Sequence, residues 1–174
     1  MWAARREEVG MGVGRDYTAG VSSEELLRRH PLFVRLTSAQ LVRFARAGEL
    51  EAFRPGEDVV VEGTLGDAMY LILTGTCDVS KGGRKLATLV PGEFFGEMSL
   101  VEPATRSATV VAAEPAQLFR LPHFVLQNLL EEDPQAFTQV LVAIVRVLSE
   151  RLRQTNSLLG SVGQLADWLA GSLV

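Results

Sequence analysis

The residues best suited to chemistry in this chain lie in the segment FFGEMSLVEPATRSATVVA, residues 94–112. Gly96 lets a ligand approach the backbone closely, and a helical turn that begins at Glu97 would present unpaired N–H groups to an anion. Arg106 carries a planar fork of donors that suits phosphate oxygens. Because a carboxylate repels phosphate, Glu97 needs a different partner, such as a sugar hydroxyl. A phosphate beside a ribose indicates a nucleotide site.

This segment resembles the phosphate-binding cassette of cyclic nucleotide-binding domains, the family of the bacterial catabolite activator and the regulatory subunit of protein kinase A. The family pattern is roughly F-G-E-hydrophobic-small-L, then a short variable stretch and R-[ST/A]-A. The matching residues here are Phe95, Gly96, Glu97, Met98, Ser99 and Leu100, followed by Arg106, Ser107 and Ala108. The resemblance extends over most of the chain, from about Leu26 to Leu159.

The resemblance implies a role for each part of the cassette. A cyclic phosphate would lie on the backbone amides that follow Gly96 and against Arg106, and a larger side chain at Gly96 would block the ligand. Glu97 would accept a hydrogen bond from the ribose 2′-hydroxyl. The implied ligand-binding residues are Phe95, Gly96, Glu97, Met98, Ser99, Arg106, Ser107, Ala108, Thr155 and Asn156.

The resemblance also implies how the base is held and how the arginine is oriented. Thr155 and Asn156 match a part of the long helix that faces the purine in the catabolite-activator branch. A hydroxyl or amide there could bond the adenine N6 amino group, which favours cAMP. Ser107 could meet a guanine amino group, so it does not separate cAMP from cGMP. Asp67 matches an aspartate that pairs with the phosphate-binding arginine in kinase regulatory subunits, and we expect it to orient Arg106.

Each of these residues also has a simpler interpretation. Arg106 can be an exposed salt-bridge arginine, and Glu97 can cap its own helical turn. Asp67 follows a glycine and can lie in a plain turn between strands. Thr155 and Asn156 can be ordinary helix surface. The cassette spacing favours the functional interpretation for Arg106 and Glu97.

The composition is that of an ordinary globular domain, with 174 residues, 47% hydrophobic and 22% charged. A net charge of −4 argues against a general nucleic-acid binder. The single cysteine, Cys77, cannot form an internal disulfide, so we expect a reducing compartment and a cytoplasmic location. The most apolar run, residues 140–148, is too short to span a bilayer, and residues 1–20 contain no signal peptide.

Helices are expected on both sides of a β-rich region. Residues 1–20 are charged and rich in glycine, which indicates a flexible N-terminal arm. One helix should begin near Ser22 and end before Pro31, and a second should begin at Thr37 and end at Gly48. Asp133 followed by proline predicts the start of a long helix. Its apolar stripe, Phe137, Leu141, Ile144, Leu148, Leu152 and Leu159, can cover the sandwich or pair with a second copy.

The region from about residue 49 to 121 contains short β-rich runs separated by turn residues. One of these turns, Gly82-Gly83, is a strong hairpin signal. We therefore predict an α+β fold, an antiparallel β-sandwich or jelly roll flanked by N-terminal helices and a long C-terminal helix. The predicted domain spans residues 21–159. Gly160 and Gly163 should interrupt the long helix, leaving residues 160–174 as an extension with a short helix over 164–173.

The function favoured by these patterns is that of a non-enzymatic regulatory module that binds a 3′,5′-cyclic nucleotide, with cAMP as the favoured ligand. Its signal would pass through movement of the C-terminal helix or homodimerisation to an effector protein that the sequence does not identify. The alternatives are a cGMP sensor and a ligand-free interaction domain on the same fold. Specific DNA binding is not expected, because no lysine or arginine follows Arg153. His30 and His123 are isolated from other metal ligands, so we expect neither a metal site nor catalytic residues.

Overall fold

The computed structural model describes residues 23–100 and 104–171. Two helices come first, α1 (Ser23–Arg29) and α2 (Ser38–Ala47). The start of α2 confirms the sequence signal, since Thr37 and Gln40 form a reciprocal capping box and Gly48 donates its N–H to the Phe44 carbonyl at the other end. The predicted arm over residues 1–20 and the helix start at Ser22 lie outside the described residues.

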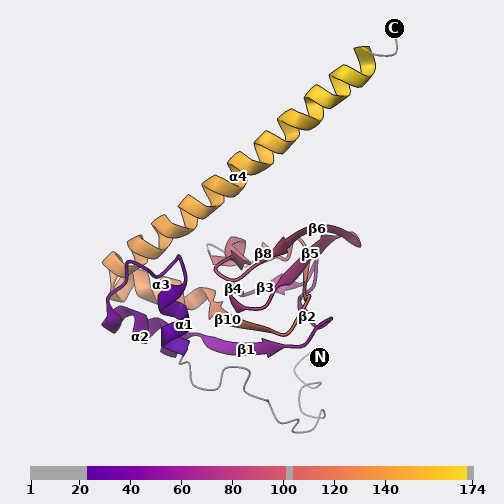
Figure 1. Cartoon of the computed structure of the whole chain (residues 1–174). Coiled ribbons are helices and arrows are strands. Elements are labelled where there is room, and N and C mark those ends of the chain that lie inside the picture. Colours follow the sequence, from indigo (N-terminus) through magenta and orange to yellow (C-terminus); the bar gives the residue numbers. More distant parts are fainter. Residues whose placement is uncertain (1–22, 101–103, 172–174) are drawn as a thin grey trace.

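The centre of the chain is a β-roll of antiparallel strands, which confirms the predicted jelly roll (Figure 1). One sheet has the order β1-β10-β4-β7, a second has the order β2-β9-β5-β6, and β3 pairs with β8. The strands are β1 (Glu49–Phe53), β2 (Asp58–Val60), β3 (Leu65–Gly66), β4 (Ala68–Thr74), β5 (Cys77–Lys81), β6 (Arg84–Leu89), β7 (Phe94–Phe95), β8 (Ala104–Thr105), β9 (Thr109–Ala112) and β10 (Ala116–Pro122).

Three short strands were not predicted. Leu65 and Gly66, which lie directly before the turn considered for Asp67, pair with Thr105 and Ala104 as β3 and β8. Strand β7 pairs with β4 immediately before the cassette. Two-residue strands carry too little periodicity to be recognised in a sequence. Strands β8 and β7 nonetheless position the residues directly before Arg106 and Gly96.

The core has two layers, and strand β4 serves both. Met69 and Leu71 belong to the cluster that packs against the helices, whereas Tyr70 and Ile72 belong to the cluster between the two sheets. Alternation of side chains along a strand produces this division. Strand β4 is therefore buried on both faces and forms a rigid support next to the cassette.

Helix α3 (His123–Glu132) follows β10, and α4 (Pro134–Gly171) begins where the sequence predicted. The Ala136 N–H donates to the Asp133 carboxylate at 3.0 Å, which caps α4. Helix α4 passes the β-roll and extends well beyond it (Figure 1).

The predicted break at Gly160 and Gly163, and a separate helix over 164–173, are wrong, because α4 is continuous through both glycines. A glycine costs about 1 kcal/mol relative to alanine in a helix, which strong helix formers on either side can offset. Within α4, Ser161 Oγ also donates to the Ser157 carbonyl at 3.0 Å. In the described part of the chain, no helix is long and apolar enough to cross a membrane.

Candidate functional site

Arg106 is the centre of the candidate site, and it is buried, with 8% of its surface exposed. Its Nη2 donates to the Ala68 carbonyl at 2.8 Å, and its Nη1 donates to Ser99 Oγ at 3.4 Å. Its backbone is fixed as well, because its N–H donates to the Thr64 carbonyl and its carbonyl accepts from the Gly63 N–H. The interpretation of Arg106 as an exposed surface arginine is therefore wrong.

Two glycines make room for this guanidinium. A Cβ atom at Gly66 would lie 2.7 Å from Arg106 Cζ and 2.6 Å from Ser99 Oγ. A Cβ atom at Gly96 would lie 2.5 Å from Arg106 Nη1, and Gly96 also has a positive φ of 77°. Both positions therefore require the absence of a side chain for Arg106 to lie where it does.

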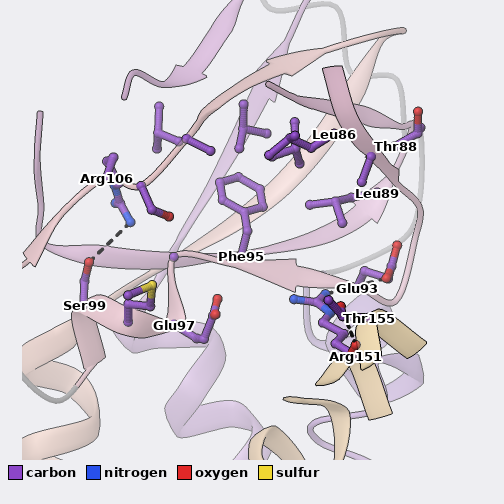
Figure 2. Close-up of a pocket in the computed structure, with 18 of the residues that line it drawn as sticks. Leu86, Thr88, Leu89, Glu93, Phe95, Glu97, Ser99, Arg106, Arg151 and Thr155 are labelled. Atoms are coloured by element: carbon purple, nitrogen blue, oxygen red, sulfur yellow. Dashed lines mark hydrogen bonds and ion pairs between the residues drawn. The ribbon is translucent and has the colours of Figure 1, made fainter. Parts of the chain in front are cut away.

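The helical turn predicted after Gly96 is present as the 3₁₀ helix Glu97–Leu100. The Ser99 N–H donates to the Gly96 carbonyl at 3.1 Å, and the Ser99 side chain is buried beside Arg106. Met98 is exposed over 61% of its surface. Figure 2 shows Glu97 below Phe95, between Ser99 on one side and Arg151 on the other.

A cavity of about 550 Å³ opens beside these residues. Nine of the ten predicted ligand-binding residues line this cavity; the exception is Asn156, the residue after Thr155 on α4. The nine are Phe95, Gly96, Glu97, Met98, Ser99, Arg106, Ser107, Ala108 and Thr155. The fold thus brings the cassette and the middle of α4 to one cavity, and the binding roles of all ten residues stay predictions.

The cavity has polar side chains at both ends and an apolar wall. Phe95 lies between the Arg106 end and the end formed by Glu93, Arg151 and Thr155 (Figure 2). The apolar lining comes from several strands and comprises Val60, Val79, Leu86, Ala87, Leu89 and Val110. Residues 86–89 were not singled out in the sequence, because an apolar residue on a hairpin strand is ordinarily part of the core. Leu86 is instead 58% exposed.

Aromatic packing fixes the floor of the cavity. The Phe95 ring stacks on Tyr70, with ring centroids 5.3 Å apart and an interplanar angle of 11°. The Arg106 guanidinium lies 5.9 Å from the Tyr70 ring centroid. Burial lowers the pKa of Arg106, whereas the nearby Tyr70 and Asp67 act in the opposite direction. An anionic ligand would compensate this buried positive charge.

Asp67 does not pair directly with Arg106 as predicted. Its carboxylate accepts from Arg120 Nη2 at 2.8 Å, while Arg106 donates to the Ala68 carbonyl. Antiparallel pairing of β4 and β10 places Arg120 opposite Tyr70, within reach of Asp67. Burial tends to lower the pKa of Arg120, but Asp67 and Tyr70 outweigh burial and raise it.

Arg151 of α4 also lines the cavity, and the sequence analysis missed it. Its Nη2 donates to the Phe94 carbonyl at 2.8 Å, and it lies 3.6 Å from Glu93 Oε1. Its guanidinium is 4.9 Å from the Phe94 ring centroid. The available signal was its position four residues before Thr155, which places both on one helix face.

Metal-ligating groups and the single cysteine are the other candidates for chemistry. Among the residues that the structure describes, no group of three histidine, cysteine, aspartate or glutamate side chains could hold a metal ion. Cys77 is fully buried, and burial raises the pKa of its thiol to about 11, so the nucleophilic thiolate is scarce at neutral pH. The cavity brings a buried guanidinium and apolar side chains to one site.

Comparison with known proteins agrees with this geometry. The family model described as "Cyclic nucleotide-binding domain" matches residues 50–133. The chain is 38% identical over 92 residues to a cGMP-dependent protein kinase of Toxoplasma gondii, covering 53% of this chain and 9% of the kinase. It is 31% identical over 136 residues to a cAMP-dependent protein kinase regulatory subunit of Mycosarcoma maydis, covering 76% of this chain and 25% of the subunit.

A solved structure shows the same architecture. The crystal structure of a cyclic nucleotide-binding domain from Methylobacillus flagellatus superposes with a TM-score of 0.68 and 28% sequence identity, covering 76% of this chain and 78% of that one. The chain spans a quarter or less of the two kinase-related proteins. The residues matched by the family model contain most of the β-roll and all of α3.

Proposed function

Because the chain belongs to the cyclic nucleotide-binding domain family, we propose that its cavity binds a 3′,5′-cyclic nucleotide and that the protein is a non-enzymatic regulatory module. The observation that carries the proposal is the buried guanidinium of Arg106 at the end of the cavity formed by the cassette. Burial of a positive charge is costly, and a phosphate would supply an ionic partner for it.

The phosphate end of the proposed site is built by the cassette. Arg106 would donate to the cyclic phosphate, together with backbone amides after Gly96 and the hydroxyl of Ser107. Glu97 would accept a hydrogen bond from the ribose 2′-hydroxyl. This assignment explains why a carboxylate lies beside an anion site, since it meets the sugar and not the phosphate.

The purine would lie against the apolar wall, with Thr155 at its edge. Thr155 Oγ1 donates to the Arg151 carbonyl at 2.9 Å, so its lone pairs are left to accept a hydrogen bond. The adenine N6 amino group is a suitable donor, and for this reason we favour cAMP. The relatives include both a cGMP-dependent and a cAMP-dependent protein, so cGMP is the alternative ligand.

Signal relay would use α4, because this helix and the cassette line the same cavity. A ligand that touches both elements favours the helix position in which both contacts are made, up to the difference in its affinity for the two positions. The outer part of α4 also carries exposed apolar side chains, which support a homodimer: Leu141, Val145, Leu152, Leu159 and Val162. An effector protein would then recognise the altered helix or dimer.

The test is calorimetric titration of the full chain with cAMP and cGMP. Replacing Arg106 by Gln should weaken binding by about ten- to a hundredfold, the loss of about 1.5–3 kcal/mol expected for a hydrogen bond to a charged group. Arg153→Gln is the matched control, since Arg153 lies on the exposed surface of α4 and pairs with Glu150. Equal affinity of wild type and Arg106→Gln would count against the proposed phosphate site.

A second function is a ligand-free interaction domain on the same fold. Thermal unfolding with cAMP, cGMP or 5′-AMP separates it from the sensor, because a ligand that binds only the folded state raises the melting temperature. A rise with a cyclic nucleotide and not with 5′-AMP supports the sensor. No rise with millimolar cyclic nucleotide would leave the interaction domain as the better description.

A further inference from the structure

Arg151 links α4 to the strand that leads into the cassette. Its guanidinium donates to the carbonyl of Phe94 at 2.8 Å and lies 3.6 Å from the carboxylate of Glu93. It also stacks over the Phe94 ring, with 4.9 Å to the ring centroid. One side chain on the helix thus makes three different contacts with two consecutive residues of the β-roll.

Glu93 and Phe94, which Arg151 contacts, are held in place by other interactions. The Glu93 carbonyl accepts from the Ile72 N–H at 2.9 Å, and the Glu93 N–H donates to the Val90 carbonyl at 3.0 Å. His30 Nε2 contacts the same Glu93 carbonyl at 3.4 Å, and the Phe94 side chain is fully buried. Arg151 therefore bonds to a rigid platform and not to a loose loop.

The position of Arg151 along α4 gives the contact its importance. Ala136, Val140 and Ile144 bury the first part of the helix in the core. From Leu152 onward, every side chain of α4 that the structure describes is exposed. Arg151 is thus the last described residue of the helix that is not exposed, just before Thr155 reaches the cavity.

The platform is also continuous with the candidate phosphate site. Phe94 and Phe95 form β7, and Gly96 follows directly. Phe95 stacks on Tyr70, which lies next to Arg106. Figure 2 shows Arg151, Glu93 and Thr155 at one end of the pocket and Arg106 with Ser99 at the other. A displacement of β7 would therefore be felt at both ends.

We infer that Arg151 is a positioning residue: it fastens α4 to β7, holds Thr155 and Leu158 at the mouth of the cavity, and couples the cassette to the position of the helix. The part of this inference that concerns ligand affinity rests on the proposed function. The part that concerns the helix position does not, because its contacts lie between residues of the chain itself.

The experiment measures hydrogen exchange in the ligand-free full chain. Arg151→Gln should raise the exchange rate of amides in α4 from about residue 148 to 158 by about tenfold, because loss of a charge-assisted bond favours local opening. Glu93→Gln should raise it less, since the bond to the Phe94 carbonyl is kept. Arg153→Gln, the control on the exposed surface of the same helix turn, should leave it unchanged.

Calorimetry on the same proteins tests the coupling. Arg151→Gln should weaken cAMP binding about three- to tenfold, and Arg151→Lys, which keeps the charge, should weaken it less. The effect of Arg151→Gln should shrink in a Glu93→Gln background, as expected for two residues that act together. Thermal unfolding of each variant checks that the fold is retained.

Two results would overturn the inference. One is that the amides of α4 exchange at the same rate in Arg151→Gln as in the wild-type protein. The other is a loss of cAMP affinity on Arg151→Gln that is equal in the wild-type and Glu93→Gln backgrounds and is not accompanied by faster exchange. That result would mean that Arg151 only contacts the ligand. If the wild-type protein binds neither cyclic nucleotide, only the proposed function is contradicted, because the exchange measurement tests the helix position without a ligand.

Discussion

Nη1 of Arg106 lies in the space that a side chain at Gly96 would occupy, only 2.5 Å from where its Cβ atom would be. The sequence predicts that Gly96 allows a ligand to approach the backbone closely. The structure adds a second reason, since the glycine makes room for the arginine itself. Gly96 and Arg106 are therefore coupled by steric fit within the chain itself.

Gly96→Ala should destabilise the fold and displace Arg106. Gly83→Ala is a matched control, because both glycines have a φ of 77° but Gly83 has no atom within 4 Å of its added Cβ. Both changes cost about 1–2 kcal/mol of backbone strain. Gly96→Ala should cost about 1–3 kcal/mol more from overpacking, measured by urea unfolding, and should also lower nucleotide affinity. Equal losses in both variants would show that the fit to Arg106 does not matter.

Thr155→Val should weaken binding of cAMP about three- to tenfold, because it removes one neutral hydrogen bond of about 0.5–1.5 kcal/mol. Asn156→Ala should change affinity less, since Asn156 does not line the cavity in this structure. Titration with cAMP and cGMP gives the ratio of the two affinities for each protein. A Thr155→Val variant that keeps the wild-type ratio would argue against Thr155 as the base contact.

His30 should make the stability depend on pH. It is buried, its Nδ1 accepts from the Leu32 N–H, and its Nε2 contacts the Glu93 carbonyl, so the neutral ring fits both contacts. Burial lowers its pKa to about 4 from the ordinary 6.5, although the Glu93 carbonyl acts against this. Between these values the unfolded chain binds more protons, so stability falls as pH falls.

Between pH 7.5 and pH 5 this histidine should remove about 2 kcal/mol of stability. His30→Gln keeps an acceptor and a donor but does not titrate, so its unfolding free energy should depend less steeply on pH. Urea unfolding of both proteins at the two pH values measures the difference. An unchanged pH dependence in His30→Gln would mean that His30 is not the responsible group.

The exposed stripe of α4 should mediate self-association. Leu152 and Leu159 are seven residues apart and 60% and 65% exposed, as expected for a helix-pairing seam. A double change of both to Glu should convert a dimer into a monomer in sedimentation equilibrium. Val34→Glu, at another apolar position with 64% exposure, is the control. A wild-type protein that is monomeric at high micromolar concentration would contradict the homodimer.

Helix caps and turns, which depend on a few neighbouring residues, were predicted correctly from the sequence. The capping box of Thr37 and Gln40, the Asp133 cap of α4 and the Gly82-Gly83 turn each depend on neighbours within four positions. The cassette is also nearly local, because its glycine, acid and arginine lie on one short segment. These features determined the element order, the jelly roll and the position of the candidate site.

Contacts between distant segments were decided by tertiary packing. Asp67 pairs with Arg120, 53 positions away, because β4 and β10 are neighbours in the sheet. Arg151 reaches Phe94, 57 positions away, because α4 crosses the edge of the β-roll. No local pattern encodes such pairs, since they depend on which strands and helices pack together.

Helix α4 shows the same limit. Its apolar stripe was visible in the sequence, but only packing decided that Ile144 is buried and that Leu152 is left exposed. The helix end predicted at Gly160 is absent, because the surrounding helix continues through it. The sequence by itself determined which elements form and which residues could bind an anion. The tertiary structure decided which side chains meet, because the free energy of packing depends on contacts between parts of the chain that local preferences do not connect.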